Sequence, residues 1–345
     1  MSLARAITTG DLTVLPSRRD EDWRWSDLRG LVRVLPSPSP AHIGAATSGP
    51  FAGLAEREVL IVNGRGPATI AVTAGDTQTV ALRFVAAADA GAHAANITVD
   101  VGAGATLTLL ESYEGEGADY VVQASLSIIL AKRARLKRVV LAADAAEAVS
   151  VSVATVDLAA ETRFTQTVLT SGAKRQRLET RVAHPGAGAT ARLDGVYVLD
   201  DKRHADITTV VNHAGPHGET DQLIKGVASD QARGVFQGRI VVSPGADQTE
   251  AKMGHHALLL SDRAEIDAKP ELEIYADDVS CAHGNTVGAL DNEALFYAQA
   301  RGIPEAEARA MLTGAFIGEV IDRIGHDGAR DVARAWVIRK LGVEP

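Results

Sequence analysis

The sequence predicts a mainly β body with helical units at its two ends, and three observations lead to this fold class. Short runs of period-two hydrophobicity, separated by Gly, Asp, Asn and Pro, extend from about Val59 to about Val287. No convincing long amphipathic helix interrupts that span. The sequence from Asp291 onward changes to helical spacing. With 345 residues, of which 46% are hydrophobic, the chain can bury a large core.

Residues 1–58 are predicted to form an N-terminal helical segment and a proline-rich linker. The charged stretch from Arg19 to Leu28 contains two tryptophans and is expected to form a short helix on the body. The three prolines of Pro36-Ser37-Pro38-Ser39-Pro40 offer no backbone donors to a strand ladder, which indicates an extended connector. Because Met1 to Asp11 has no apolar core of a secretory signal, we expect a cytoplasmic location.

Residues 59–290 are predicted to form the β core. Period two is clear in Ser150–Val153, Leu193–Leu199 and Glu271–Tyr275. More than 200 residues of short strands is long for a single sandwich, which favours a stacked solenoid or β-helix. No fixed repeat period is clear, so periodicity alone leaves both architectures open.

Residues 291–345 are predicted to form a small helical unit. Pro304 stands where a first-turn proline is tolerated. A second apolar stripe begins with Val332, Trp336 and Val337 after Asp327-Gly328. The first stripe occupies one face of the preceding helix and consists of Leu312, Phe316, Ile317, Val320, Ile321 and Ile324.

Composition argues against two classes of partner. The chain has 35 basic and 44 acidic residues, a net charge of -9, and only 4% aromatic residues, so we expect no nucleic-acid partner. The basic run from Lys132 to Arg138 alternates with apolar residues and is interpreted as the solvent face of a strand. No stretch approaches the roughly 20 apolar residues of a membrane helix, so no membrane partner is expected.

The chemistry-bearing motifs are few. The sequence contains no Gly-Lys dipeptide, and therefore no Walker A loop, and we expect no nucleotide to bind this chain. Cys281 is the single cysteine, so it can form no internal disulfide and cannot alone hold a cluster that needs about four ligands. Metal chemistry would require histidines or another chain.

Cys281 and His283 are the first candidate metal ligands. Residues two apart on a strand project from the same face, so the thiol and the imidazole would lie side by side, with Gly284 leaving space beyond them. Sulfur next to imidazole suits iron, zinc or copper. The alternative is a buried cysteine that acts as a small hydrophobic residue beside a structural histidine.

The other histidines are weaker candidates. His213 and His217 flank a Gly-Pro turn that would have to bring both rings together. His255 and His256 are adjacent, so on a strand they would face opposite sides. His184 precedes Pro185 and is interpreted as a turn residue.

The second half of the sequence contains several characteristic blocks: 233–240, Leu258-Leu259-Leu260-Ser261-Asp262, 269–274, 276–284, 286–291, Leu295-Phe296-Tyr297 and Arg301-Gly302-Ile303. Together these blocks resemble the SufB/SufD family of iron-sulfur cluster assembly proteins. The Asp-Asp-Val-x-Cys-x-His-Gly block resembles the SufD branch in particular, whereas the SufB branch has a histidine flanked by glutamates there. The chain departs from the common pattern at Asn285 and Asp247, and we interpret both as tolerable variation.

The resemblance implies a right-handed parallel β-helix between the two helical pieces. It also implies a non-catalytic scaffold subunit in a complex with SufB-like and SufC-like proteins, in which SufC is the ATPase. The C-terminal unit would bind SufC, with Phe296, Tyr297 and Arg301 as partner-binding residues. His283 and then Cys281 would contact a nascent, transient iron-sulfur cluster at the junction with SufB. A homodimer is expected when SufB is absent, because a β-helix end exposes unpaired strand edges.

Two rival functions remain at this point. A β-helix carbohydrate lyase or hydrolase would need paired carboxylates, or a base with a bound cation, in an aromatic-lined groove, which 4% aromatic content argues against. A purely structural adaptor, in which Cys281 and His283 merely pack, is the second rival.

Overall fold

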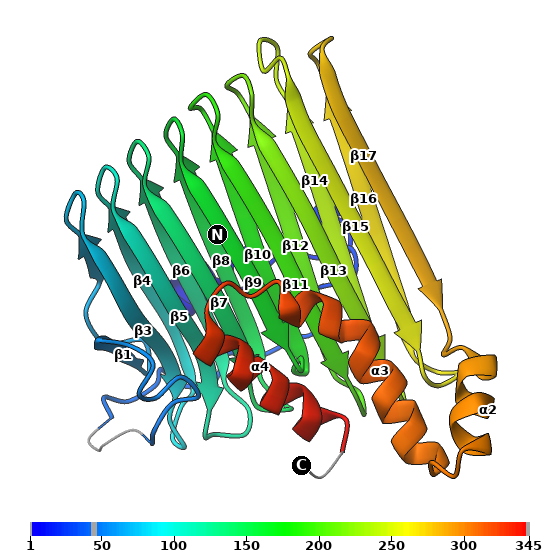
Figure 1. Ribbon diagram of the computed structural model, residues 1–345. Coiled ribbons are helices and arrows are strands. Elements are labelled where there is room, and N and C mark those ends of the chain that lie inside the picture. Colours follow the sequence, from blue (N-terminus) through cyan, green and yellow to red (C-terminus); the bar gives the residue numbers. More distant parts are fainter. Residues whose placement is uncertain (1, 43–46, 343–345) are drawn as a thin grey trace.

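The computed structural model describes residues 2–42 and 47–342, and these form a parallel β-solenoid, with helices from both ends of the chain packed against its sheets (Figure 1). Odd-numbered strands form a nine-stranded front sheet in the order β1-β3-β5-β7-β9-β11-β13-β15-β17. Even-numbered strands form an eight-stranded rear sheet in the order β16-β14-β12-β10-β8-β6-β4-β2. The prediction of a mainly β body is confirmed, and of the two architectures left open the solenoid is the one observed.

The front strands are β1 Arg57–Val62, β3 Thr77–Ala86, β5 Thr106–Gly115, β7 Arg135–Ala143, β9 Arg163–Thr170, β11 Thr190–Leu199, β13 Glu219–Ala228, β15 Thr249–Leu259 and β17 Val279–Gly288. The rear strands are β2 Thr69–Val72, β4 Ala92–Val101, β6 Val121–Leu130, β8 Val149–Leu158, β10 Arg175–His184, β12 His204–His213, β14 Arg233–Val242 and β16 Glu265–Ile274. The chain runs down the front sheet and up the rear sheet while it advances from β1 to β17, which makes a right-handed coil (Figure 1).

Before the last two strands, β16 and β17, each turn of the solenoid buries one face of its strands. In the front sheet Leu107, Leu136 and Phe164 occupy equivalent positions on successive strands and are all buried. Because paired residues of parallel strands point the same way, equivalent apolar side chains stack in columns along the axis. The core is therefore a continuous apolar column between the sheets.

The basic run illustrates how strand alternation divides charges between two environments. Arg135 and Lys137 are exposed, as predicted for the solvent face of a strand. Arg138 instead points inward, where its guanidinium lies 2.7 and 2.8 Å from the two carboxylate oxygens of Glu111. The interpretation of the whole run as a solvent face is thus wrong for Arg138, because successive strand residues face opposite sides.

The N-terminal segment crosses the outer face of the rear sheet. Its helix is α1 (Ser2–Thr9), and the stretch predicted to be a short helix contains only the 3-10 turn η2 (Glu21–Trp23), after a similar turn, η1 (Leu12–Val14). The Trp23 ring lies 4.4 Å below the Arg177 guanidinium, and the Ser26 hydroxyl donates to Asp206 over 2.5 Å. These side-chain contacts with the sheet hold the segment in place, so it packs on the rear sheet without forming the predicted helix.

The C-terminal helices are α2 (Asn292–Ala300), α3 (Glu305–Asp322) and α4 (Asp327–Lys340). The Asp291 carboxylate caps α2 by accepting from the backbone N–H of Glu293 and Ala294. α3 and α4 pack on the outer face of the front sheet. The residues of this second core include Val196, Leu223 and Val227 from the strands and Ile317, Val320, Ile321, Ile324 and Trp336 from the helices.

Candidate functional site

The last strand of the front sheet, β17, carries both predicted ligands on one face. Cys281 pairs in register with Ala251, and His283 pairs with Met253, two β15 residues whose side chains are buried inside the solenoid. The intervening Lys252 points outward. Cys281 and His283 therefore both project from the inner face of β17, as their spacing predicts.

The two side chains differ in their surroundings. Cys281 is half-buried and packs against the apolar core, whereas His283 is exposed. Burial raises the pKa of the Cys281 thiol above its usual value of 9.0, although the Ala251 backbone opposes this shift. The thiol is thus protonated at neutral pH in the free chain, and an iron ion would have to displace its proton.

The inner face of β17 belongs to an incompletely covered end of the solenoid. β16 and β17 are the terminal strands of their sheets, so each has a neighbour on one side only. The side chains of Ile274, Tyr275 and Val287 at this end are 43%, 61% and 43% exposed. Unpaired strand edges beside exposed apolar side chains are typical of a surface that another chain covers.

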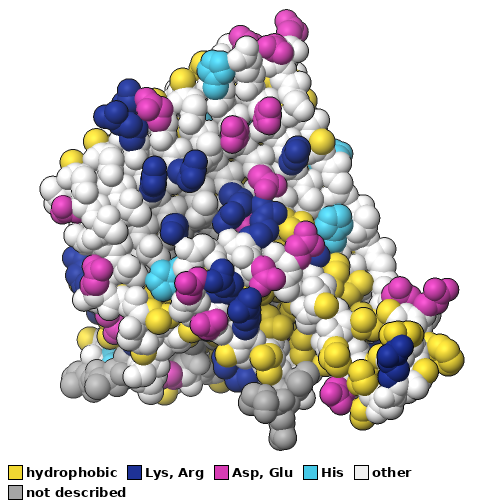
Figure 2. All heavy atoms as spheres, in the orientation of Figure 1, with side chains coloured by type: hydrophobic (Ala, Val, Ile, Leu, Met, Phe, Trp, Pro, Cys, Tyr) yellow, Lys and Arg dark blue, Asp and Glu magenta, His cyan; other side chains and the backbone are white. Residues whose placement is uncertain are grey.

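A second exposed surface lies on the helical hairpin of α2 and α3. Phe296 and Tyr297 are 71% and 60% exposed, and Met311 of α3 is 53% exposed. The Arg301 guanidinium stacks 4.2 Å from the Tyr297 ring. Figure 2 shows hydrophobic side chains gathered over α2 and α3 at the lower right. We call Phe296, Tyr297, Arg301 and Met311 the hairpin patch.

The histidines that were weaker candidates do not gather around a metal position. His255 is buried inside and His256 lies outside, as predicted. His217 lies in a turn, whereas His213 ends β12 inside the core. Among the described residues, no group of three or more His, Cys, Asp or Glu side chains is arranged to hold a metal ion.

The interpretation of His184 as a turn residue is wrong. His184 is the last residue of β10, is fully buried, and packs against His213 with ring centroids 4.3 Å apart and ring planes tilted by 32°. The following Pro185 ends the strand but does not move His184 out of it, because the extended conformation suits a residue before proline.

Sequence reasoning missed the partner of Asn285. This residue lies in line with Cys281 and His283 on the inner face of β17, and its Oδ1 lies 2.7 Å from Nδ1 of the buried His255. His255 in turn lies 2.9 Å from the Tyr197 hydroxyl through Nε2. The departure at Asn285 therefore has a defined structural role, which could be found only by knowing the register of β15 and β17.

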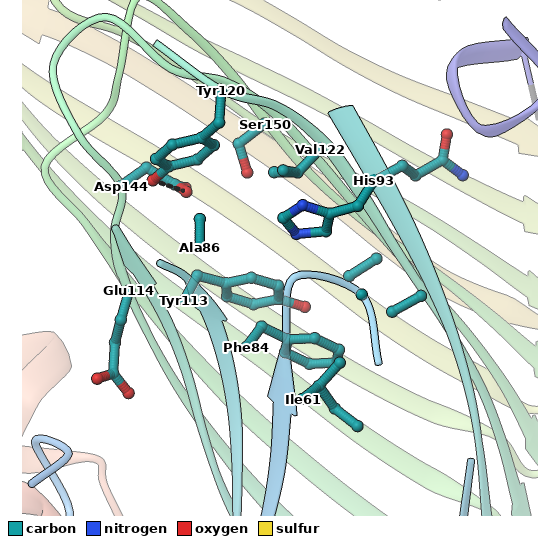
Figure 3. A pocket seen from close by; sticks show the side chains of 14 residues that line it. Ile61, Phe84, Ala86, His93, Tyr113, Glu114, Tyr120, Val122, Asp144 and Ser150 are labelled. Carbon is teal, nitrogen blue, oxygen red and sulfur yellow. Dashed lines mark hydrogen bonds between the residues drawn. The ribbon is translucent and has the colours of Figure 1, made fainter. Parts of the chain in front are cut away.

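The cavity drawn in Figure 3 is a different kind of feature. It lies between the sheets near the first strands, where Phe84 and Tyr113 stack and the Tyr120 hydroxyl donates to Asp144 over 2.9 Å. It admits only a water-sized molecule. β3 and β17 lie at opposite ends of the front sheet, so this cavity belongs to the packing of the core and not to the site at β17.

These features define a class of protein: a parallel β-solenoid whose uncovered end carries a thiol and an imidazole in line, and whose helical hairpin exposes aromatic side chains. The family model described as "SUF system FeS cluster assembly, SufBD core domain" matches residues 84–316. The chain belongs to this SufBD family. Within the described residues, no helix is both long and apolar enough to cross a membrane.

Individual relatives support the SufD branch of the family. The chain is 35% identical to the iron-sulfur cluster assembly protein SufD of Escherichia coli over 180 residues, which are 52% of this chain and 42% of the relative. It is 31% identical to SufD of Bacillus subtilis over 45% of this chain and 36% of that protein. It is 30% identical to the chloroplastic protein ABCI7 of Arabidopsis thaliana over 68% of this chain and 50% of that one. The matches thus span half or less of each relative's length.

Proposed function

We propose that this chain is a scaffold subunit of a SufBCD-type complex, in which an iron-sulfur cluster forms between its β17 end and a SufB-like partner. The observation that carries the proposal is the line of Cys281 and His283 on the inner face of a strand at the uncovered end. Two ligands fill only part of the coordination of a cluster, so a partner must supply the others. The cluster is cargo of the assembly, held transiently and passed on.

The division of labour follows from the same features. The sequence has no phosphate-binding loop, so the energy of ATP would enter through a SufC-like ATPase. The hairpin patch supports docking of that ATPase, because exposed aromatic and arginine side chains are enriched where protein partners bind. The chain itself would be non-catalytic.

The test compares three alanine variants in the complex with SufB-like and SufC-like partners. We expect His283→Ala to reduce cluster yield more than Cys281→Ala, because His283 is exposed at the end while Cys281 packs partly into the core. His256→Ala is the matched control, since it removes an imidazole from the outer face of the neighbouring strand. Visible absorbance and iron content after anaerobic reconstitution measure the yield.

Complex assembly is checked for each variant by its mass. Wild-type cluster yield from an intact complex carrying His283→Ala would remove this histidine from the site. Wild-type yield from the complex carrying both Cys281→Ala and His283→Ala would leave the structural adaptor as the function.

A further inference from the structure

Asn285 completes a row of three polar side chains on the inner face of β17, after Cys281 and His283. It is also the exposed end of a hydrogen-bond chain that begins in the interior. The Tyr197 hydroxyl lies 2.9 Å from Nε2 of His255, and Nδ1 of His255 lies 2.7 Å from Oδ1 of Asn285. Tyr197 and His255 are both fully buried. A buried chain thus leads to a single exposed carboxamide beside the proposed ligands.

In this hydrogen-bond chain, the chemistry of Asn285 decides which atom donates and which accepts at each contact. The carboxamide oxygen of Asn285 can only accept, so Nδ1 of His255 carries the proton. Nε2 is then unprotonated and accepts a hydrogen bond from the Tyr197 hydroxyl. Burial lowers the pKa of His255 to about 4, so the ring is neutral at physiological pH and keeps this arrangement.

The consequence lies on the exposed side of Asn285. With its oxygen held by His255, the carboxamide leaves its Nδ2 group, with two N–H donors, available at the solenoid end. Cys281 and His283 offer lone pairs to iron, whereas these N–H groups suit an acceptor. An N–H donor held in advance by buried groups stabilises developing negative charge without reorganisation.

We propose that Asn285 donates hydrogen bonds to the sulfide sulfur of the cluster that forms between this chain and its SufB-like partner. The proposal rests on the proposed function and deepens it, because it assigns this chain a contact with sulfur in addition to iron. Hydrogen bonds to cluster sulfurs stabilise the reduced state and raise the reduction potential. His255 and Tyr197 are positioning residues, which act only by holding the carboxamide.

The experiment uses the assembled complex, reconstituted anaerobically with ferrous iron, ferric iron and sulfide. Asn285→Ala is expected to lower the reduction potential and to speed cluster loss to an added chelator by about tenfold, the effect of losing one hydrogen bond to a charged acceptor. Asn285→Asp keeps the acceptor for His255 but replaces the N–H donors with negative charge, so its potential should fall further. Tyr197→Phe removes the hydroxyl that selects the His255 tautomer. It should lower the reduction potential by a smaller amount than Asn285→Ala does.

Thr286→Ala is the matched control. Thr286 Oγ1 lies 2.7 Å from Nδ1 of His256, so this variant removes a contact between the same two strands on the outer face. Its potential and rate of cluster loss should equal those of the wild type. Thermal unfolding of each variant separates an effect on the cluster from a loss of folding.

Three outcomes overturn the proposal. If Asn285→Ala and Thr286→Ala have equal reduction potentials and equal rates of cluster loss, Asn285 does not contact the cluster. The proposed function still stands in that case, provided that cluster yield depends on His283. A wild-type complex that forms no cluster overturns both. The third outcome concerns the free protein labelled with ¹⁵N-histidine. A ¹⁵N spectrum that shows His255 protonated at Nε2 would contradict the claim that His255 holds the Asn285 carboxamide oxygen.

Discussion

His184 and His213 form a pair of imidazoles in contact in the interior of the solenoid. Nε2 of His213 forms a hydrogen bond of 2.9 Å with the Thr220 hydroxyl. In the part of the chain that the structure describes, Nδ1 of His213 and both ring nitrogens of His184 have no hydrogen-bond partner. Burial lowers the pKa of His184 to about 3 and that of His213 to about 4. Both rings are therefore neutral in the folded protein at physiological pH.

This pair predicts a loss of stability in acid. Below pH 6.5 the unfolded chain protonates each histidine while the folded chain does not, so the free energy of unfolding falls as pH drops from about 6.5 toward 4. Each histidine contributes up to about 1.4 kcal/mol per pH unit in that window. Urea unfolding at several pH values measures this dependence. In His184→Leu the free energy of unfolding should fall less steeply with decreasing pH, by the contribution of one histidine. Parallel curves for variant and wild type would contradict the assignment.

The buried ion pair of Arg138 and Glu111 predicts a strong asymmetry between single and double variants. Their side chains are 3% and 0% exposed, and two hydrogen bonds join them. Arg138→Met should cost about 3–5 kcal/mol, because it leaves an uncompensated carboxylate in the core. Arg138→Met with Glu111→Gln should recover much of that loss. Denaturant unfolding measures both, and equal losses in the single and double variants would refute the pairing argument.

For individual residues, spacing along the sequence predicted part of the candidate site. The shared face of Cys281 and His283 follows from strand alternation alone, which is a property of adjacent residues. The contact of Asn285 with His255 depends on pairing between strands thirty residues apart, since His255 is in register with Asn285. Sequence spacing contains no such register, so this part of the site could not be predicted.

Among the elements, α3 shows how one helix can serve two surfaces. Its later residues Ile317, Val320 and Ile321 are buried against the front sheet, as their helical spacing predicted for an apolar face. Its earlier residue Met311 is exposed. Periodicity locates the apolar stripe but not the boundary between the part that the sheet covers and the part left to a partner.

The hairpin patch predicts a loss of partner binding without loss of folding. Phe296→Ser together with Tyr297→Ser should weaken binding of a SufC-type ATPase by about 30-fold, the effect of losing an aromatic anchor worth about 2 kcal/mol. The free energy of unfolding should change by less than about 0.5 kcal/mol, because both side chains are exposed. Titration calorimetry measures the affinity.

The control for this pair is Ile129→Ser, which removes an exposed apolar side chain from β6 of the rear sheet. Deleting the helices would be a poorer experiment, because it would uncover Val196, Leu223 and Val227 of the front sheet. Unchanged ATPase affinity in the Phe296/Tyr297 variant would assign the docking surface elsewhere.

The whole molecule is a repeat whose period varies. Thr77, Thr106, Arg135 and Arg163 occupy equivalent positions on successive front strands, at intervals of 29, 29 and 28 residues. All four positions are polar, but the side chain is threonine in two turns and arginine in the next two, so neither the interval nor the side chain repeats exactly. This explains why the strands were predictable from the sequence while the period was not.

The uncovered end predicts self-association of the free chain. Strand edges at β16 and β17 can pair with those of a second copy when a SufB-like partner is absent. Ile274→Lys together with Val287→Lys should give a monomer by analytical ultracentrifugation at micromolar concentration, because it places charges in the paired surface. Thermal unfolding should change little, since both side chains are 43% exposed. A monomeric wild type, or a dimeric variant, would exclude this end as the pairing surface.

The most direct test of the central claim is whether an imidazole of this chain binds the cluster iron. Only this chain is labelled with ¹⁵N-histidine, assembled with unlabelled SufB-like and SufC-like partners, and reconstituted anaerobically. Pulsed electron paramagnetic resonance of the reduced cluster should then show one strongly coupled ¹⁵N nucleus, which persists in His256→Ala and disappears in His283→Ala. A reduced cluster with no coupling to ¹⁵N from this chain would contradict the account.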